Sequence, residues 1–104
     1  MDRYLFLGFV RIHILHHAAE EPVYGSWLIE ELGRHGYSLS PGTLYPILHG
    51  LEEKGYLRSE KRVVESKVRR YYHITAAGRR ALKAAKKMAK ELVDEILVER
   101  RRAR

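Results

Sequence analysis

The sequence predicts a mainly α-helical protein with a two-stranded β-hairpin, and three observations support this fold class. Apolar residues recur at helical spacing in three segments before residue 56 and in one long segment after residue 75. Between these segments the polarity alternates at period two, and β-branched and aromatic residues are common, as in strands. The chain has 104 residues, 45% of them hydrophobic and 32% charged, which suits a single small domain with a modest core.

The first helix is predicted at residues 3–18, and it is apolar on more than one side. Its apolar residues fall on two neighbouring stripes, the first with Leu5, Phe9 and Ile12 and the second with Leu7, Val10 and Ile14. A surface helix of a small domain normally buries one stripe. The pattern therefore indicates that something besides the domain itself covers this helix.

The second and third helices are separated by a short link. The second is predicted at residues 24–35 and stops at Gly36. Ser40 is a good N-cap for the third helix, and Pro41 suits its first position, where an N–H would have no partner. Gly55 ends the third helix, whose apolar stripe consists of Leu44, Ile47, Leu48 and Leu51.

Pro46 is unusual because it lies inside the third helix. It cannot donate a hydrogen bond to the carbonyl of Gly42, and its ring crowds that carbonyl, which costs about 3 kcal/mol in a helix interior. The missing side chain of Gly42 eases the crowding. We expect a first turn that is opened or bent and that presents Gly42 and Thr43 outward.

The segment after the third helix predicts the hairpin and then a last helix. The runs YLRSEKRVV and VRRYYHIT flank the polar tripeptide ESK, which places the hairpin tip near residues 65–67. Thr75 can cap a last helix that runs from Ala76 to about Arg100. Apolar residues in this helix are spaced alternately three and four apart, as in the seam of a short coiled coil. The seam residues are Leu82, Ala85, Ala89, Leu92 and Ile96.

The basic charge is concentrated in the second half of the chain. Residues 1–57 contain four Lys/Arg and seven Asp/Glu, whereas residues 58–104 contain sixteen and six. Such a field favours a polyanionic partner, and nucleic acid before a membrane, since the basic segment lacks the bulky aromatic anchors of a membrane-surface helix. The alternative is a solvated surface whose net charge maintains solubility.

Several classes of protein are disfavoured. The chain has no cysteine, so it can form neither a disulfide framework nor a thiolate metal site, and a cytoplasmic location is expected. The apolar run at residues 4–10 is too short to span a bilayer, so no membrane association is expected. Asp2 and Asp94 are the only aspartates, and no nucleophile is accompanied by a base and an orienting group. We therefore expect no enzymatic activity.

Three helices followed by a basic hairpin are the elements of a winged helix-turn-helix, in which one helix enters the major groove of DNA and the wing contacts the flanking backbone or minor groove. The segments YGSWLIEEL, SPGTLYPILHGLEEKGYL and RRYYHITAAGRRAL resemble, in order and spacing, the PadR family of transcriptional regulators. The resemblance covers residues 3–85, and the short last helix is similar to that of the family's small subclass.

This resemblance implies a winged helix-turn-helix domain at residues 1–75, followed by a dimerisation helix and basic tail at residues 76–104. It implies a homodimeric repressor that binds double-stranded DNA at a pseudo-palindromic operator and is released by a small effector. The groove-facing residues would be Ser40, Thr43, Tyr45 and His49, and the wing contacts would be Lys67, Arg69 and Arg70. The dimer interface would combine Leu5, Phe9 and Ile12 with Leu82, Ala85, Ala89, Leu92 and Ile96.

The sequence departs from the family pattern in the wing. PadR-family wings commonly carry glycine near the tip, where this chain has VESKVRR. The turn geometry of the wing is therefore not carried over from the family.

A group of histidines in the first helix raises the question of a metal. His13 and His17 are one helical turn apart, and Glu21 follows at the same spacing. These three side chains could bind Zn²⁺ or a similar divalent ion, which would then be the effector. The alternative is a polar end to a helix that is otherwise buried, with no cofactor.

Three functions remain open from the sequence. The first is a DNA-binding repressor released by a small effector, and the second is a metal-responsive form of it. The third is a dimeric winged-helix adaptor that binds protein. The basic wing favours the first two over the third, and metal-dependent DNA affinity would separate the first from the second.

Overall fold

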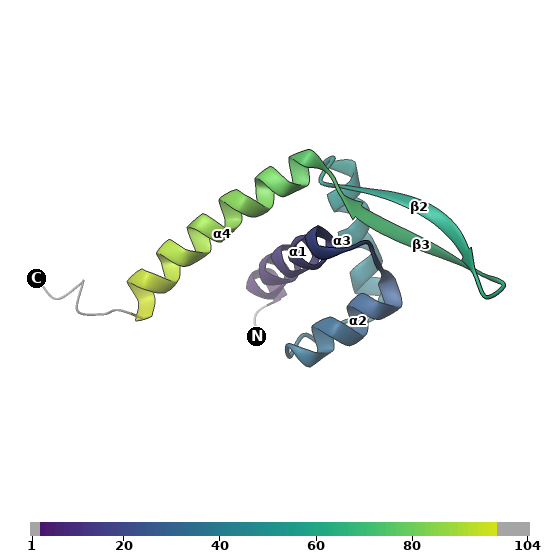
Figure 1. The fold of residues 1–104 in the computed structure, drawn as a ribbon. Helices are drawn as coiled ribbons and strands as arrows, with labels where there is room; N and C mark the ends of the chain where they lie inside the picture. The colour runs from purple at the N-terminus through teal and green to yellow at the C-terminus, as the bar shows by residue number, and fades with distance from the viewer. Residues whose placement is uncertain (1–2, 98–104) are drawn as a thin grey trace, which may run out of the picture.

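The computed structural model describes residues 3–97 as a helical body from which a β-hairpin and a long helix project in opposite directions (Figure 1). In chain order the elements are α1 (Arg3–Glu20), β1 (Val23–Tyr24), α2 (Gly25–Arg34), α3 (Pro41–Glu53), β2 (Leu57–Val64), β3 (Lys67–Ile74) and α4 (Ala76–Leu97). The expected end of the last helix, beyond Leu97, and the basic tail lie outside the described residues. None of the described helices is long and apolar enough to cross a membrane.

The sheet has one strand more than the sequence predicted. β2 and β3 form the expected hairpin, and β1 pairs antiparallel with the other edge of β3, which gives the order β1-β3-β2. In this register Val23 lies opposite Tyr72, and Tyr24 lies opposite Tyr71. A strand of two residues is too short to show period-two alternation, which is why the sequence predicted only a two-stranded hairpin.

The caps form where the sequence predicted them. The Ser40 Oγ accepts a hydrogen bond from the Thr43 N–H at 3.3 Å, and the Thr75 Oγ1 accepts one from the Gly78 N–H at 3.0 Å. Gly36 and Gly55 follow α2 and α3 with φ of +91° and +81°. After each of these glycines the chain reverses through the pair of hydrogen bonds typical of a glycine C-terminal motif.

Pro46 does not interrupt its helix, since α3 is helical from Pro41 to Glu53 and its first turn is not opened. The nearest atom to a Cβ placed on Gly42 would be the Ser40 Oγ at 3.8 Å, so the backbone that Pro46 crowds has open space around it. A side chain at Gly42 would therefore not meet the Pro46 ring, so the expectation that Gly42 eases the crowding finds no support in the packing.

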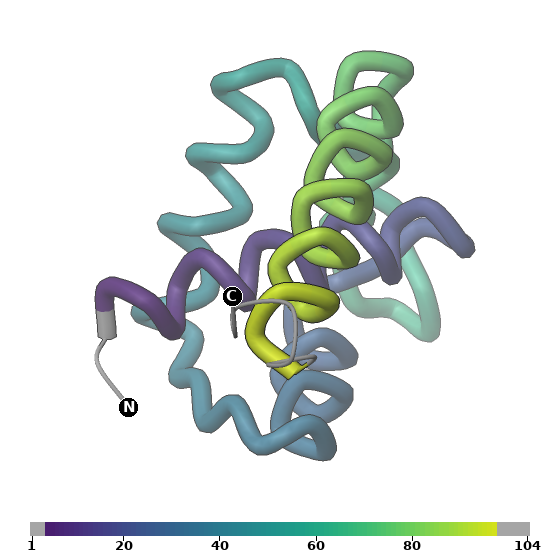
Figure 2. The backbone as a smooth tube through the Cα atoms, turned by 90° about the vertical axis from the view of Figure 1, so that its left-hand side faces the viewer, coloured from purple at the N-terminus to yellow at the C-terminus, as the bar shows by residue number. Residues whose placement is uncertain are grey.

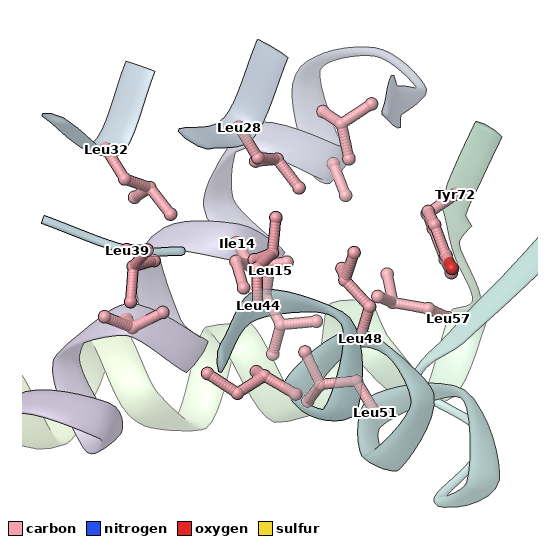
Figure 3. Packing of buried hydrophobic residues seen from close by; sticks show 14 of the residues in the cluster. Ile14, Leu15, Leu28, Leu32, Leu39, Leu44, Leu48, Leu51, Leu57 and Tyr72 are labelled. Carbon is pink, nitrogen blue, oxygen red and sulfur yellow. The ribbon is translucent and has the colours of Figure 1, made fainter. Parts of the chain in front are cut away.

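The core lies where the three N-terminal helices meet the base of the hairpin (Figure 3). Its most deeply buried side chains, each with at most 1% of its surface exposed, are Val10, Ile14, Leu28, Leu32, Leu44, Leu48 and Leu57. Each of the three helices contributes two of these residues, so burial of their apolar faces fixes α2 against α3 as a helix-turn-helix. The N-terminal part of α4 packs across α1 (Figure 2), and the rest of α4 extends past the body (Figure 1).

Candidate nucleic-acid interface

The outward face of α3 carries the residues that the sequence predicted to face DNA. Leu44, Ile47 and Leu48 turn into the core, and this rotation leaves Tyr45 and His49 exposed on the opposite face. Ser40 is exposed and Thr43 is partly exposed at the start of the same helix. All four predicted residues are therefore at least partly exposed, with Tyr45 and His49 one turn apart on the surface of α3 and Ser40 and Thr43 at its start.

The two hydroxyl groups at the tip of α3 are bonded to each other. The Ser40 Oγ accepts from the Thr43 backbone and donates to the Thr43 Oγ1, both at 3.3 Å. The first turn contains no acidic residue. Its positive helix-dipole end can therefore approach a phosphate without a repelling carboxylate on the same turn.

Tyr45 has a structural contact as well as an exposed side. Its hydroxyl end lies directly above Gly25, the first residue of α2, where any side chain would collide with the ring. Tyr45 nevertheless keeps 45% of its surface exposed. Tyr45 thus packs α3 against the start of α2 and still leaves part of its side chain open to solvent.

The wing closes through a two-residue turn in which both residues have positive φ. Val64 pairs with Lys67, and the intervening Glu65 and Ser66 have φ of 50° and 67°. Positive φ at both central residues matches a type I′ hairpin turn, which Asn and Gly adopt more easily. The wing therefore keeps a tight tip without the glycine that is common at this place in the family.

The predicted wing cations differ in how freely they can reach a partner. The guanidinium of Arg69 lies 4.3 Å from the centre of the Tyr24 ring. A hydrogen bond with Tyr71 raises the pKa of Arg69 above its ordinary value. Lys67 is exposed beside the turn. Arg70 lies on the opposite face of β3 from Arg69, as strand alternation requires.

Arg70 belongs to a chain of contacts that joins the wing to α3. It donates a hydrogen bond to the Ser59 Oγ at 2.9 Å, and that hydroxyl donates to the Glu52 carboxylate at 2.8 Å. The Ser59 N–H also donates to Glu52, at 3.0 Å. Glu52 lies in the last turn of α3, so these bonds fix the angle between the helix and the wing. Nothing in the spacing of the sequence pointed to Ser59 or Glu52.

Arg62 is a further exposed wing cation that the sequence did not single out. It lies opposite Arg69 in the register, 4.6 Å from the centre of the Tyr71 ring, and pairs with Glu60 at 2.6 Å. Hydrogen bonds from Arg62 and from His73 hold the pKa of Glu60 below its usual value. Only the strand register, which the sequence alone did not give, brings Arg62 and Arg69 together.

Comparisons with known proteins agree with this geometry. The family model described as "Transcriptional regulator PadR-like family" matches residues 14–84, from the middle of α1 into α4. The chain belongs to the PadR-like family of transcriptional regulators. The curated transcriptional regulator Rv3488 of Mycobacterium tuberculosis is 57% identical over 88 residues, which cover 85% of this chain and 82% of that protein.

Solved structures support the same family and fold. The crystal structure of a PadR family transcriptional regulator from Eggerthella lenta matches with a TM-score of 0.79 at 34% identity, over 89% of this chain and 82% of that one. A Streptococcus transcriptional regulator matches with a TM-score of 0.83 over 96% and 99% of the two chains, and at 21% identity it shows the fold alone. PadR-family proteins are DNA-binding regulators, which confirms the prediction that this chain is not an enzyme.

The predicted dimer interface, formed by α1 and α4, is largely exposed to solvent in this PadR-family chain. Leu5, Phe9, Leu92 and Ile96 are each about half exposed, at 60%, 49%, 50% and 55%. The remaining predicted interface positions are the exposed Ala89 and the partly exposed Ile12 and Ala85. Leu82 is only 4% exposed and packs in the chain's own core, so it offers little surface to a second copy.

Of the three predicted metal ligands, the structure brings two together and replaces the third. His13 and His17 do lie together, but Glu21 follows the end of α1 at Glu20 and belongs to neither of the side-chain groups that could hold an ion among the described residues. The histidine that joins them is His35, which follows α2. Burial lowers the pKa of both His13 and His17, and neighbouring histidines lower it further. These rings therefore favour the neutral form.

Proposed function

We propose that this protein is a homodimeric repressor that binds a pseudo-palindromic operator in the cytoplasm and is released by a small effector. The observation that carries the proposal is the exposed surface of α3, with Thr43, Tyr45 and His49, beside a wing that presents Lys67 and Arg70. The α3 face contains no Lys or Arg. Base contacts would come from α3, and phosphate contacts from the wing.

The dimer is supported by the apolar surface that one chain leaves uncovered. Leu92 and Ile96 repeat at coiled-coil spacing on α4, and Leu5 and Phe9 lie one turn apart on α1. Apolar residues grouped in this way indicate an interaction surface, and a second copy of the chain supplies a self-complementary one. Two copies would present two α3 helices and two wings to the halves of a palindrome.

Operator selectivity tests the proposal. The operator would be located by footprinting on the DNA beside the gene, and affinity for it and for random DNA would be measured by fluorescence anisotropy. We expect Thr43→Ala with His49→Ala to reduce the operator-to-random affinity ratio by about tenfold or more, since each lost base contact is worth about 1–3 kcal/mol. Lys87→Ala with Glu91→Ala, on exposed positions of α4, is the matched control.

The two outcomes separate the alternatives. Base reading by α3 would be supported if the control variant keeps the wild-type selectivity and the Thr43→Ala, His49→Ala variant loses it. No measurable binding of the wild-type protein to any DNA would contradict the proposal and favour a protein-binding adaptor.

A further inference from the structure

Three histidines from distant parts of the sequence meet where α1 contacts the end of α2. His13 and His17 come from α1, and His35 is the residue that follows α2. One ring nitrogen of each lies within 4.8 Å of the others. The centre of the His35 ring is 5.1 Å from that of His13 and 6.1 Å from that of His17. The fold therefore gathers three imidazoles at one point.

His17 is the group in this cluster whose hydrogen bonding is incomplete. It is 8% exposed, and its Nε2 is buried without a hydrogen-bond partner among the described residues. The nearest carboxylate oxygen, Glu31 Oε2, is 3.8 Å away, too far for a hydrogen bond. A buried nitrogen without a partner has lost its hydrogen bonds with water and gained none in return, so this atom calls for an explanation.

A carboxylate completes the surroundings of the cluster. Glu31, in the last turns of α2, lies 3.2 Å from the His35 Nε2 and 3.8 Å from the His17 Nε2. Its side chain is 16% exposed, compared with 45% for His35. Glu31 also pairs with Arg34 at 3.0 Å, so its charge is partly balanced. A carboxylate is nevertheless the usual partner of a metal-binding histidine.

We propose that His13, His17 and His35 bind one divalent transition-metal ion of the zinc type, with Glu31 at the edge of the site. Three neutral imidazoles and an adjacent carboxylate form a donor set that suits such an ion, and they leave a fourth position for water or another ligand. The unpartnered His17 nitrogen is accounted for because a metal–nitrogen bond replaces the missing hydrogen bond.

A second histidine group in the same region is a weaker candidate. His16, His17 and Glu20 also lie within 4.8 Å of one another, but all three come from a single helix end. His16 and Glu20 are 45% and 62% exposed. His16 is no more exposed than His35, and its ring lies 5.1 Å from that of His17, so the difference lies in Glu20. The exposed Glu20 side chain would have to be ordered before it could bind an ion. This difference provides a matched control.

The location of the site gives the ion a regulatory role, which rests on the proposed repressor function. α1 carries part of the apolar surface assigned to the dimer, and α2 packs on α3, the helix assigned to the DNA groove. An ion held between α1 and the end of α2 would fix the helix-turn-helix relative to the dimer. It would therefore change DNA affinity, and DNA would change ion affinity by the same factor.

Calorimetry on the full-length, tag-free protein after removal of metal with a chelator tests the site directly. We expect one Zn²⁺ per chain at micromolar concentration. His35→Gln and His13→Gln should each weaken binding more than about 100-fold, because losing a ligand costs more than the roughly 10–100-fold lost with an outer partner. His16→Gln with Glu20→Gln should bind as wild type does.

Thermal unfolding provides a second readout that depends on neither DNA nor heat of binding. Zn²⁺ should raise the Tm of the wild-type protein and of the His16/Glu20 control but not that of His35→Gln, because only an ion bound to the native state stabilises it. His35 is exposed, so its variant should fold in the absence of metal. A metal-free Tm for His35→Gln close to that of the wild type would verify this.

Two results would overturn the site. One is a wild-type protein that binds no Zn²⁺ at micromolar concentration. The other is a His35→Gln variant that binds normally while the His16/Glu20 control does not. Equal operator affinity with and without Zn²⁺, in a protein that does bind the ion, would overturn the regulatory role. A protein that binds Zn²⁺ but no DNA would contradict the repressor function and leave the calorimetric result standing.

Discussion

Two glycines in α2 illustrate how much a single residue position matters to the helix-turn-helix. Gly25 and Gly33 are in the same helix, but their surroundings are opposite. A Cβ at Gly25 would overlap the hydroxyl end of Tyr45, whereas a Cβ at Gly33 would have no neighbour within 4 Å. The same substitution should therefore change stability in opposite directions at the two positions.

We expect Gly25→Ala to lower the free energy of unfolding by about 1–3 kcal/mol, since the overlap forces Tyr45 or α2 to move. Gly33→Ala should raise it by up to about 1 kcal/mol, because alanine favours the helix more than glycine does. Urea unfolding of both variants measures the difference. Adding Tyr45→Ala to Gly25→Ala should recover part of the loss. Equal effects of the two glycine substitutions would show that Tyr45 does not pack α3 against the start of α2.

At the scale of elements, the sequence predicted the helices better than the sheet. Residues with strong local signals, such as the Ser40 cap and the terminal Gly55, lie where the patterns indicated. β1 was missed because a two-residue strand exists only through its pairing with β3, and no local pattern encodes that pairing. Leu82 continues the apolar spacing of α4, yet α4 rests on α1 at that point, so the residue is buried within its own chain.

The apolar stripe of α4 gives a prediction for the dimer. Leu92→Glu would place a carboxylate in a surface that a second copy of the chain is expected to bury, where an unpaired charge is costly. We expect sedimentation to show at least a tenfold weaker dimer, which corresponds to about 1.4 kcal/mol. Ala84→Glu introduces the same charge on the same helix at an exposed position outside the seam, and it should leave the dimer unchanged. Equal effects of both variants would remove the stripe from the interface.

At the scale of the whole molecule, the histidine cluster and the contacts between wing and α3 are formed by side chains from distant segments. This distance along the chain limits what the sequence could predict. The four α3 residues were predicted from the resemblance to the PadR family, which rests on one short, continuous segment of sequence. His35 is separated from His17 by a loop, β1 and all of α2, so only the packing of α1 against α2 brings the two together. The contacts from Arg70 through Ser59 to Glu52 likewise depend on the strand register and on how α3 meets β2.

The distribution of charge over the molecule gives the last prediction, which concerns salt. The wing and α4 from Arg79 to Lys90 are both basic, but the two elements project in opposite directions (Figure 1), so we expect only one of them to meet the phosphates. We expect Lys67→Ala, Arg69→Ala and Arg70→Ala together to weaken binding to operator and random DNA alike. The salt dependence should flatten by about 0.9 in log–log slope for each lost phosphate contact.

A second triple variant removes the same charge from the other basic element. Lys83→Ala, Lys87→Ala and Lys90→Ala replace exposed cations on α4, and the slope should then stay close to that of the wild type. Within the wing, Arg69→Ala alone should flatten the slope less than Lys67→Ala, because Arg69 is already stacked on Tyr24. If both triple variants reduce the slope equally, net charge rather than the wing attracts the DNA, and the assignment of phosphate contacts to the wing is wrong.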